Sequence, residues 1–542
     1  MIRSTIYTVS LVLILGLLLP GGLVLQSDPA FAQSRSLGKV NFKTSCNRKA
    51  QKRINIAVAL LHHMMYKQAE KEFLNAADLD PSCAMAFWGV AMTEFHPLWA
   101  PPSKSELMKG NAAVQKAKKL APENQREQGY ISAVEAFYDG WETKDHKSRI
   151  AAWSDGQKVL LDNNPNDVDA HAFYALSLLA TAPKSDKEFN NQRKAGEILQ
   201  EQQKKYRKHP GLFHYTIHAY DNPVLAEKGV KVANGYDKIA PNVPHALHMP
   251  SHIFVRLGMW PQTIKWNKRS ANAAEEQSGD VMSLHYIHAV DYLIYAYLQK
   301  GQYAKAEKLL EKVNGIENYQ DSFASAYGIA AAQSRASVEQ MKWDEAASTA
   351  LRTHSSFPWD KHPQYEAITY YVRGLGAARS GDLESAAKDK AMLDTLYTET
   401  LNNGQTYWAT IVDAQRQTVA AWITYESGDK ATGLQMMQAA ADLEDSVDKH
   451  PVTPGAVMPA RDMFGDMLLM SGKPGDALAA YEASLKISPK RFYSLYSAGY
   501  AAEQAGDTEA AVKYYSDLVK ITAKADKGNE RIAHAKDYVK NN

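Results

Sequence analysis

The chain has 542 residues, of which 45% are hydrophobic and 23% charged, and its 62 lysines and arginines nearly balance 60 aspartates and glutamates. This composition is typical of a globular protein that is long enough for several domains or for one extended array of repeats. A formal net charge of +2 without any basic block gives no reason to expect nucleic acid as a partner.

The first 32 residues have the features of a cleavable signal peptide. Arg3 supplies the positive end, residues 6–26 carry no charge, and Ala30-Phe31-Ala32 forms a cleavage site. An uncleaved membrane anchor is the alternative, because the uncharged run is about long enough to span a bilayer, although Pro20-Gly21-Gly22 interrupts it. We expect cleavage after Ala32, a periplasmic or secreted protein, and no stable membrane insertion of the mature chain.

Small and aromatic residues recur along the chain with a period near 34. The windows 56–81 and 464–489 carry them at the same offsets: Ala57 and Gly465, Ala69 and Ala477, Phe73 and Tyr481, Ala76 and Ser484, Pro81 and Pro489. Small residues let two antiparallel helices pack closely, and the rings fill the space between successive pairs. The pattern resembles the tetratricopeptide repeat (TPR) superfamily from about residue 50 to residue 525, and it is degenerate between about 100 and 206. The resemblance implies an all-α, right-handed superhelical solenoid of antiparallel helix pairs.

A narrower resemblance rests on three stretches, HYTIHAYDNP, HALHMPSHIFVRLGMW and HPVTPG. They are similar to a family of exported bacterial TPR proteins that carry an HxxHMPSHIF motif, and this similarity implies the fold but no activity. We divide the chain into a signal peptide (1–32), a lead-in (33–49), N-terminal repeats (50–206), histidine-rich repeats (207–320), C-terminal repeats (321–525) and a terminal cap (526–542).

The chain has only two cysteines, Cys46 and Cys83. They form no C-x-x-C motif, which excludes thioredoxin-type chemistry and zinc ribbons. Each precedes the first helix of one of two successive repeats, and export makes a disulfide possible. A structural bridge and two free thiols are both open at this point.

The densest group of histidines is His245, His248 and His252. Their spacings of three, four and seven residues place three imidazoles on one face of an α-helix. Such a group favours a metal site, because a metal satisfies several ring nitrogens at once. In the TPR register this helix begins at Pro244, and the resemblance implies that the three positions line the concave surface. The same positions of the next repeat are held by His288, Asp291 and Tyr295.

Further candidate ligands lie near this group. His214 and His218 are one helical turn apart, the usual spacing for two ligands to one metal. His285 is a further candidate, three residues before His288. Weaker candidates, which a curled superhelix would bring closer, end the first helices of early repeats: His63, Glu94 and His96. We expect His209 to be exposed.

Pro250 conflicts with a continuous helix through this group, because proline lacks the backbone N–H that the helix needs there. Either the helix begins at Pro250, with His245 and His248 in the lead-in turn, or the helix is kinked at the proline. Only the kinked helix keeps all three imidazoles on one face.

Imidazole ligands suit copper, zinc and iron alike. Methionines near the histidines favour copper in an exported protein: Met64, Met65, Met249, Met259 and Met282. Asp221 or Asp291 beside two histidines would instead form a facial triad for iron. Copper is the metal that we favour, with zinc and iron as alternatives.

We therefore expect an exported metalloprotein with a histidine-rich site in its concave groove. The alternative is a metal-free groove that binds a peptide, a protein or a small molecule through histidine and tyrosine side chains. Whether the site is catalytic stays open, because the chain has no G-x-S-x-G, H-E-x-x-H or P-loop motif. The catalytic candidates are Tyr215 and Tyr295, which could orient a substrate, and Arg256, which could pair with a substrate carboxylate.

Overall fold

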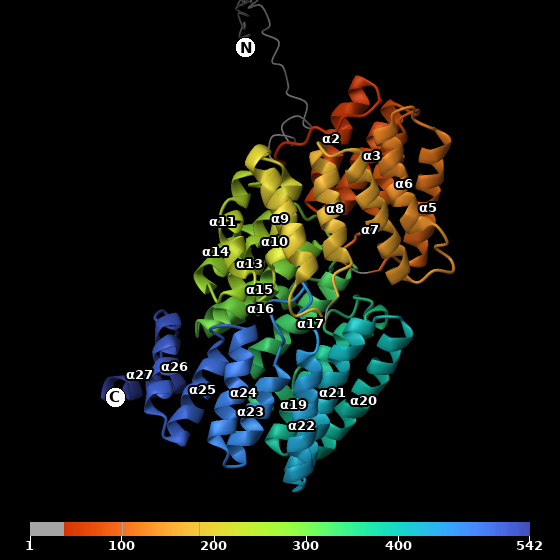
Figure 1. Ribbon diagram of the computed structural model, residues 1–542. Coiled ribbons are helices and arrows are strands. Elements are labelled where there is room, and N and C mark those ends of the chain that lie inside the picture. Colours follow the sequence, from red (N-terminus) through yellow and green to blue (C-terminus); the bar gives the residue numbers. More distant parts are fainter. Residues whose placement is uncertain (1–36, 100, 184) are drawn as a thin grey trace, which may run out of the picture.

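The computed structural model describes residues 37–542 apart from 100 and 184, and helices make up most of this part of the chain (Figure 1). The expected signal peptide and its cleavage site lie outside the described residues. Within the described ranges, no helix is long and apolar enough to cross a membrane. The all-α prediction is confirmed.

The helices form consecutive antiparallel pairs, and each pair packs on the next. The first helices of the pairs are α2 (Arg48–His62), α4 (Ala84–Thr93), α6 (Gln125–Tyr138), α8 (Val168–Ala180), α10 (Pro210–Tyr220), α12 (Pro244–His248) with α13 (Pro250–Arg256), α15 (Leu284–Gln299), α17 (Phe323–Val338), α19 (Pro363–Ser380), α21 (Thr406–Glu426), α23 (Ala460–Met470) and α25 (Phe492–Ala505). The second helices are α3 (Tyr66–Leu79), α5 (Lys104–Lys119), α7 (His146–Asn163), α9 (Asn190–Lys205), α11 (Ala226–Ala233), α14 (Trp260–Glu276), α16 (Tyr303–Asn314), α18 (Trp343–Ala347), α20 (Leu383–Asn402), α22 (Lys430–Asp445), α24 (Pro474–Ile487) and α26 (Thr508–Ile521). The pairing continues through residues 100–206, where the sequence pattern is degenerate, and α27 (Glu530–Asn541) packs on the last pair.

Close contacts between a glycine and a ring explain the recurring small and aromatic residues. A Cβ atom added to Gly465 would lie 2.5 Å from the ring of Tyr481, and one added to Gly499 would lie 2.6 Å from the ring of Tyr515. These distances leave no room for a larger residue, so the spacing of the two helices depends on the glycine. Gly258 has a φ of +61° in the turn before α14, which confirms the register that places Pro244 at the start of α12.

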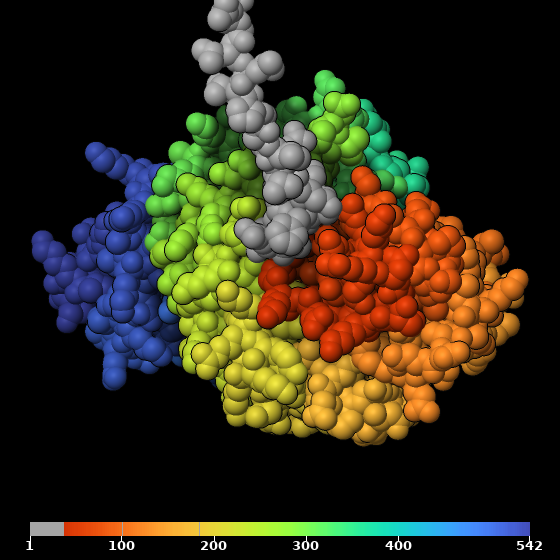
Figure 2. All heavy atoms as spheres, turned by 90° about the horizontal axis from the view of Figure 1, so that it is seen from above, coloured from red at the N-terminus to blue at the C-terminus, as the bar shows by residue number. Residues whose placement is uncertain are grey.

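The N-terminal repeats fold back onto the middle of the chain. α2 packs against α10, and Nδ1 of His214 on α10 donates a hydrogen bond of 2.7 Å to the backbone carbonyl of His62 on α2. Figure 2 shows the red and orange N-terminal repeats lying directly against the yellow and green middle of the chain. In the C-terminal half, the amide of Phe492 donates to Oε1 of Gln299 at 2.7 Å, so α25 closes onto α15.

Residues 446–459, between α22 and α23, run into the interior of the solenoid, and we call them the plug segment. The Tyr292 hydroxyl on α15 donates to the carbonyls of Pro451 (3.1 Å) and Thr453 (3.0 Å). Arg335 on α17 donates to the carbonyl of Gly455 at 2.8 Å. These bonds satisfy backbone groups that burial would otherwise leave unpaired. Because all its partners here are first helices, the plug segment lies on the concave side, where Figure 1 shows a blue segment reaching toward α17.

Cys46 and Cys83 form a disulfide with a Cα–Cα distance of 4.9 Å. The bridge joins the start of α2 to the start of α4, which are the first helices of two successive pairs. Of the two possibilities that the sequence left open, the structure therefore has the bridge.

Replacing both cysteines by serine is expected to lower the stability of the N-terminal repeats. The bridge closes a loop of 37 residues, and by the loop-entropy relation this contributes about 4 kcal/mol to the free energy of unfolding. Urea unfolding of the wild type and of Cys46→Ser/Cys83→Ser measures the loss. The reduced wild type is the matched control and should unfold with the double variant, whereas equal midpoints for oxidised and reduced protein would contradict the expectation.

Candidate metal centre

Two short helices carry the central histidines. Proline occupies the first turn of both α12 and α13, where its missing N–H costs no helical hydrogen bond. Met249 between them keeps helical dihedrals (φ −49°, ψ −40°), so the chain continues in nearly the same direction. The second alternative from the sequence, a helix kinked at Pro250, describes this arrangement. His248 and His252 consequently point the same way, with their Nε2 atoms 3.0 Å apart.

His248, His252 and His288 form the first of two histidine triads, which we call triad A. They come from α12, α13 and α15, and one ring nitrogen of each lies within 4.8 Å of those of the other two. All three side chains are buried, and the ring centroids of His248 and His288 are 4.1 Å apart. The ring of Tyr292 packs edge-on against His248 at 4.6 Å. Three imidazoles thus converge in a site closed off from solvent.

Hydrogen bonds fix the tautomer of His248. Its Nδ1 lies 2.7 Å from Oδ1 of Asn267. The amide nitrogen of Asn267 donates to Oγ of Ser251 (2.7 Å) and to the carbonyl of Thr263 (2.9 Å), so Oδ1 is the acceptor. Nδ1 of His248 therefore carries the hydrogen, and in the neutral ring its Nε2 carries the lone pair.

Asp221 fixes the tautomer of His252 in the same way. Its Oδ2 accepts a hydrogen bond of 2.8 Å from Nδ1 of His252, which leaves the lone pair on Nε2. Oδ1 accepts from Nε of Arg256 (2.8 Å) and pairs with Nζ of Lys449 from the plug segment (3.0 Å). Arg256 also binds Asp448 at 2.9 Å, so two carboxylates balance two cations. Burial alone would raise the pKa of Asp221, but Lys449 and Arg256 lower it well below its ordinary value.

The two Nε2 lone pairs of His248 and His252 therefore face each other at 3.0 Å. Such a contact needs a positive charge between the rings, which is either a proton or a metal ion. Burial, with His288 and His252 nearby, lowers the pKa of His248 well below its ordinary value. Burial also lowers the pKa of His252, although Asp221 opposes this. These shifts favour the neutral rings, which are the forms that bind metals.

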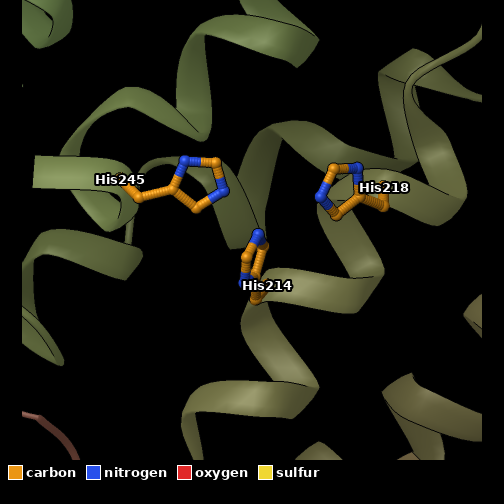
Figure 3. A group of neighbouring side chains, drawn as sticks. All are labelled: His214, His218 and His245. Atoms are coloured by element: carbon orange, nitrogen blue, oxygen red, sulfur yellow. The ribbon is translucent and has the colours of Figure 1, made fainter. Parts of the chain in front are cut away.

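His214, His218 and His245 form the second triad, which we call triad B. Figure 3 shows His214 and His218 on α10 and His245 on α12, with a nitrogen of each ring turned toward the space between them. These nitrogens lie within 4.8 Å of one another. Among the described residues, no hydrogen-bond partner meets either ring nitrogen of His245 or Nε2 of His214. His285 packs beside His245, with ring centroids 5.3 Å apart, and belongs to neither triad.

The structure places four of the candidate ligands away from both triads. Asp291 is fully buried, and its Oδ1 pairs with Nε of Arg335 at 2.9 Å. Both ring nitrogens of His63 are engaged, by the Tyr236 hydroxyl (2.8 Å) and the Leu37 carbonyl (3.1 Å). The remaining two form ion pairs near the N-terminus, Glu94 with Lys109 and His96 with Glu106.

The three catalytic candidates are dispersed. The Tyr215 hydroxyl lies 3.1 Å from Nδ1 of His62 rather than in a triad. Arg256 holds Asp221 and Asp448, so its guanidinium is largely occupied by protein carboxylates. Tyr295 is buried and lines a cavity beside the plug segment.

The sequence patterns did not predict several residues that lie around the triads. His209 is buried rather than exposed, and it shares the Asp169 carboxylate with His62 at 3.1 and 2.9 Å. These three side chains form a third cluster of possible ligand atoms. Lys449 and Asn267 position the histidines of triad A. The HPVTPG stretch next to Lys449 is the only feature of the sequence that points to either residue. Their roles arise from packing between distant repeats, which a local pattern does not reveal.

The histidines are also more enclosed than a concave groove would make them. His245, His248 and His252 have exposed fractions of 4%, 1% and 1%. Two features close the site, namely the return of α2 onto α10 and the plug segment, whose Lys449 reaches Asp221. The site is therefore buried in the interior rather than on an open binding surface.

The buried histidines predict a fold that acid destabilises. Burial lowers the pKa of His62 to about 4, of His63 to about 3 and of His285 to about 4, whereas an unfolded histidine titrates near 6.5. Between these values the unfolded state binds more protons, so stability falls as the pH drops from 6.5 toward 4, by about 2 kcal/mol per histidine at pH 5. Thermal unfolding in chelator should show a clearly lower midpoint at pH 5 than at pH 7. An equal or higher midpoint at pH 5 would contradict this.

Comparisons with known proteins concern the repeats. Residues 463–527 match a family model described as tetratricopeptide repeat, and a search of curated proteins finds no match. The chain is similar to the human IFIT1 dimer with PPP-AAAA, with 11% identity over 86% of this chain and 95% of that chain and a TM-score of 0.40. It is also similar to the APC/C hetero-tetramer Cut9-Hcn1, with 12% identity over 91% of this chain and 89% of that chain and a TM-score of 0.32.

Structural likeness at these scores says nothing about the metal centre. The match over the C-terminal repeats agrees with the succession of antiparallel helix pairs from α2 to α26. The match to the tetratricopeptide repeat family is thus established for residues 463–527, which include α24, α25 and α26.

Proposed function

We propose that the chain is an exported metalloprotein in which triad A binds one transition-metal ion. The observation that carries the proposal is the contact of 3.0 Å between Nε2 of His248 and Nε2 of His252, whose other nitrogens are both held by hydrogen-bond acceptors. Two nitrogens bound at 2.0–2.1 Å to one ion are separated by about 2.9–3.4 Å at angles of roughly 90–110°. The observed separation falls in this range.

The surroundings of triad A support a metal rather than a proton. Metal-binding histidines usually donate their second ring N–H to a carboxylate or a carbonyl, and His252 with Asp221 and His248 with Asn267 have this arrangement. His288 supplies a third nitrogen from α15. A set of three imidazoles leaves a fourth position for water or another small ligand, as in catalytic zinc sites.

Three imidazoles favour copper or zinc as the metal. For a given set of nitrogen ligands, divalent copper binds more tightly than zinc, which agrees with the copper that we favour from the sequence. An iron site with two histidines and one carboxylate is less well supported. Asp291 pairs with Arg335, and Asp221 is already engaged by His252, Arg256 and Lys449.

Triad B provides a second set of ligands. Nδ1 of His214 donates to the His62 carbonyl, so the lone pair of its Nε2 is directed elsewhere. A buried imidazole without partners, such as His245, costs free energy unless a ligand satisfies it. We therefore propose a second ion at triad B.

The alternative function, peptide binding by a metal-free groove, needs histidines that a peptide can reach. The exposed fractions of the triad A histidines are at most 7%, and the plug segment occupies the concave side. The enclosed site favours the metal. We propose the periplasm or the cell exterior as the location, and the Cys46–Cys83 disulfide supports an oxidising compartment.

Elemental mass spectrometry on mature protein purified without an affinity tag should find close to two equivalents of copper or zinc. His248→Ala/His252→Ala removes two nitrogen ligands of triad A and should lose one equivalent, and His214→Ala/His245→Ala should lose the other. His171→Ala is the matched control, since its Nε2 bonds the Pro165 carbonyl away from both triads, and it should keep both ions. Full metal content in His248→Ala/His252→Ala would show that triad A is not the site.

Variants of two buried aspartates distinguish an effect on metal affinity from an effect on stability. Asp221→Asn weakens the carboxylate that orients His252, so metal affinity should fall roughly ten- to a hundredfold. Asp291→Asn disturbs an equally buried ion pair with Arg335 and should lower stability without changing metal affinity. Competition with a chromogenic chelator gives the affinities, and urea unfolding gives the stabilities. If both variants lose the metal to the same degree, Asp221 has no specific role.

A further inference from the structure

A cavity of about 100 Å³ lies beside the metal centre, between the plug segment and the helices α13, α15, α17, α19 and α21. A single water occupies about 10–15 Å³ on this scale, so the cavity has room for roughly seven to ten waters or for a small molecule of similar size. Its walls are mainly apolar and aromatic, with Trp408 among the rings. Triad A and triad B contribute no residue to its lining.

Four buried polar atoms of the cavity lining have no hydrogen-bond partner among the described residues: Nη1 of Arg256, the hydroxyl of Tyr295, Oε1 of Gln364 and Oε1 of Gln415. Each of these residues is at least nine-tenths buried. Folded proteins pair nearly all such atoms, so four unpaired atoms in the lining of one cavity point to a ligand that binds there. The four residues come from four different helices, α13, α15, α19 and α21, so the unpaired atoms do not arise from one local defect.

The unpaired atoms define the chemistry of the ligand. Nε and Nη2 of Arg256 are bound by Asp221 and Asp448, while Nη1 still offers a charged donor, which suits a carboxylate oxygen. Oε1 of Gln364 and Oε1 of Gln415 are acceptors and require an N–H or O–H group. The aromatic walls suit a flat apolar body.

We propose that this cavity binds a small aromatic carboxylate that also bears a hydrogen-bond donor. Arg256 donates to the carboxylate, and the two glutamine side chains accept from the ligand's donor group. The Asp221 carboxylate binds both Arg256 and His252. Arg256 and Asp221 therefore link the bound ligand to His252 of triad A. The binding itself needs no metal ion, and the proposal stands independently of the metal centre.

Isothermal titration of mature, chelator-treated protein tests the proposal with three compounds of similar size. 4-Hydroxybenzoate has both groups, benzoate lacks the donor, and 4-hydroxybenzyl alcohol lacks the carboxylate. We expect one equivalent of 4-hydroxybenzoate to bind and each of the others to bind at least tenfold more weakly. Equal binding of all three, or no binding of any at millimolar concentration, would overturn the proposal. Binding that appears only after metal is restored would also overturn it, because it would place the carboxylate on a metal ion.

Conservative variants show whether the glutamines make the contacts. Gln364→Met and Gln415→Met keep the side-chain length and remove the amide, so each should weaken 4-hydroxybenzoate binding roughly three- to tenfold. Gln417→Met is the matched control, because Gln417 lies on α21 like Gln415 but its amide bonds Asp413 outside the cavity. This variant should leave 4-hydroxybenzoate binding unchanged. Thermal unfolding identifies any variant with altered folding. Unchanged affinity in both folded cavity variants, or an equal loss in the control, would contradict the assigned contacts.

Discussion

The carboxylate of Asp221 is the group on which the arrangement of the interior depends. It lies at the end of α10 and binds His252 and Arg256 from α13 and Lys449 from the plug segment. A buried carboxylate is costly unless it is paired and fully hydrogen-bonded, so these elements must come together for any of them to be stable. Through this one group, the closure of the solenoid also orients the imidazole of His252.

Closure changes what the concave side of the repeats can do. In an open solenoid the first helices line an extended surface that partners can reach. Here the plug segment binds α13, α15 and α17 through Arg256, Tyr292 and Arg335. Two enclosed sites remain, namely the histidine triads and a neighbouring aromatic cavity. Small ligands suit both sites better than an extended peptide does.

Local patterns in the sequence predicted the parts of the site that depend on a single helix. The period of small and aromatic residues predicted the helix pairs, and the spacing of His248 and His252 predicted that they share a face, because both follow from helical geometry. His245, which the same spacing grouped with them, belongs to triad B instead. Contacts between distant repeats could not be predicted in this way. Asp291 has the same register position as a triad histidine, yet Arg335 of the next repeat pairs with it. His209 was expected to be exposed, but α2 and α8 enclose it through His62 and Asp169. The enclosure of the triads also depends on residues 446–459, whose Lys449 reaches Asp221 from a distant part of the chain.

The position of a bound ion would show directly whether triad A is a metal site. Anomalous diffraction at the copper or zinc absorption edge, on crystals of protein that retains its metal, would place the ion without assumptions about its ligands. We expect a peak in triad A about 2.0–2.1 Å from Nε2 of His248 and Nε2 of His252, with the Asp221 carboxylate still on the far side of the His252 ring. A stoichiometric metal found elsewhere, with these two nitrogens still in direct contact, would contradict it.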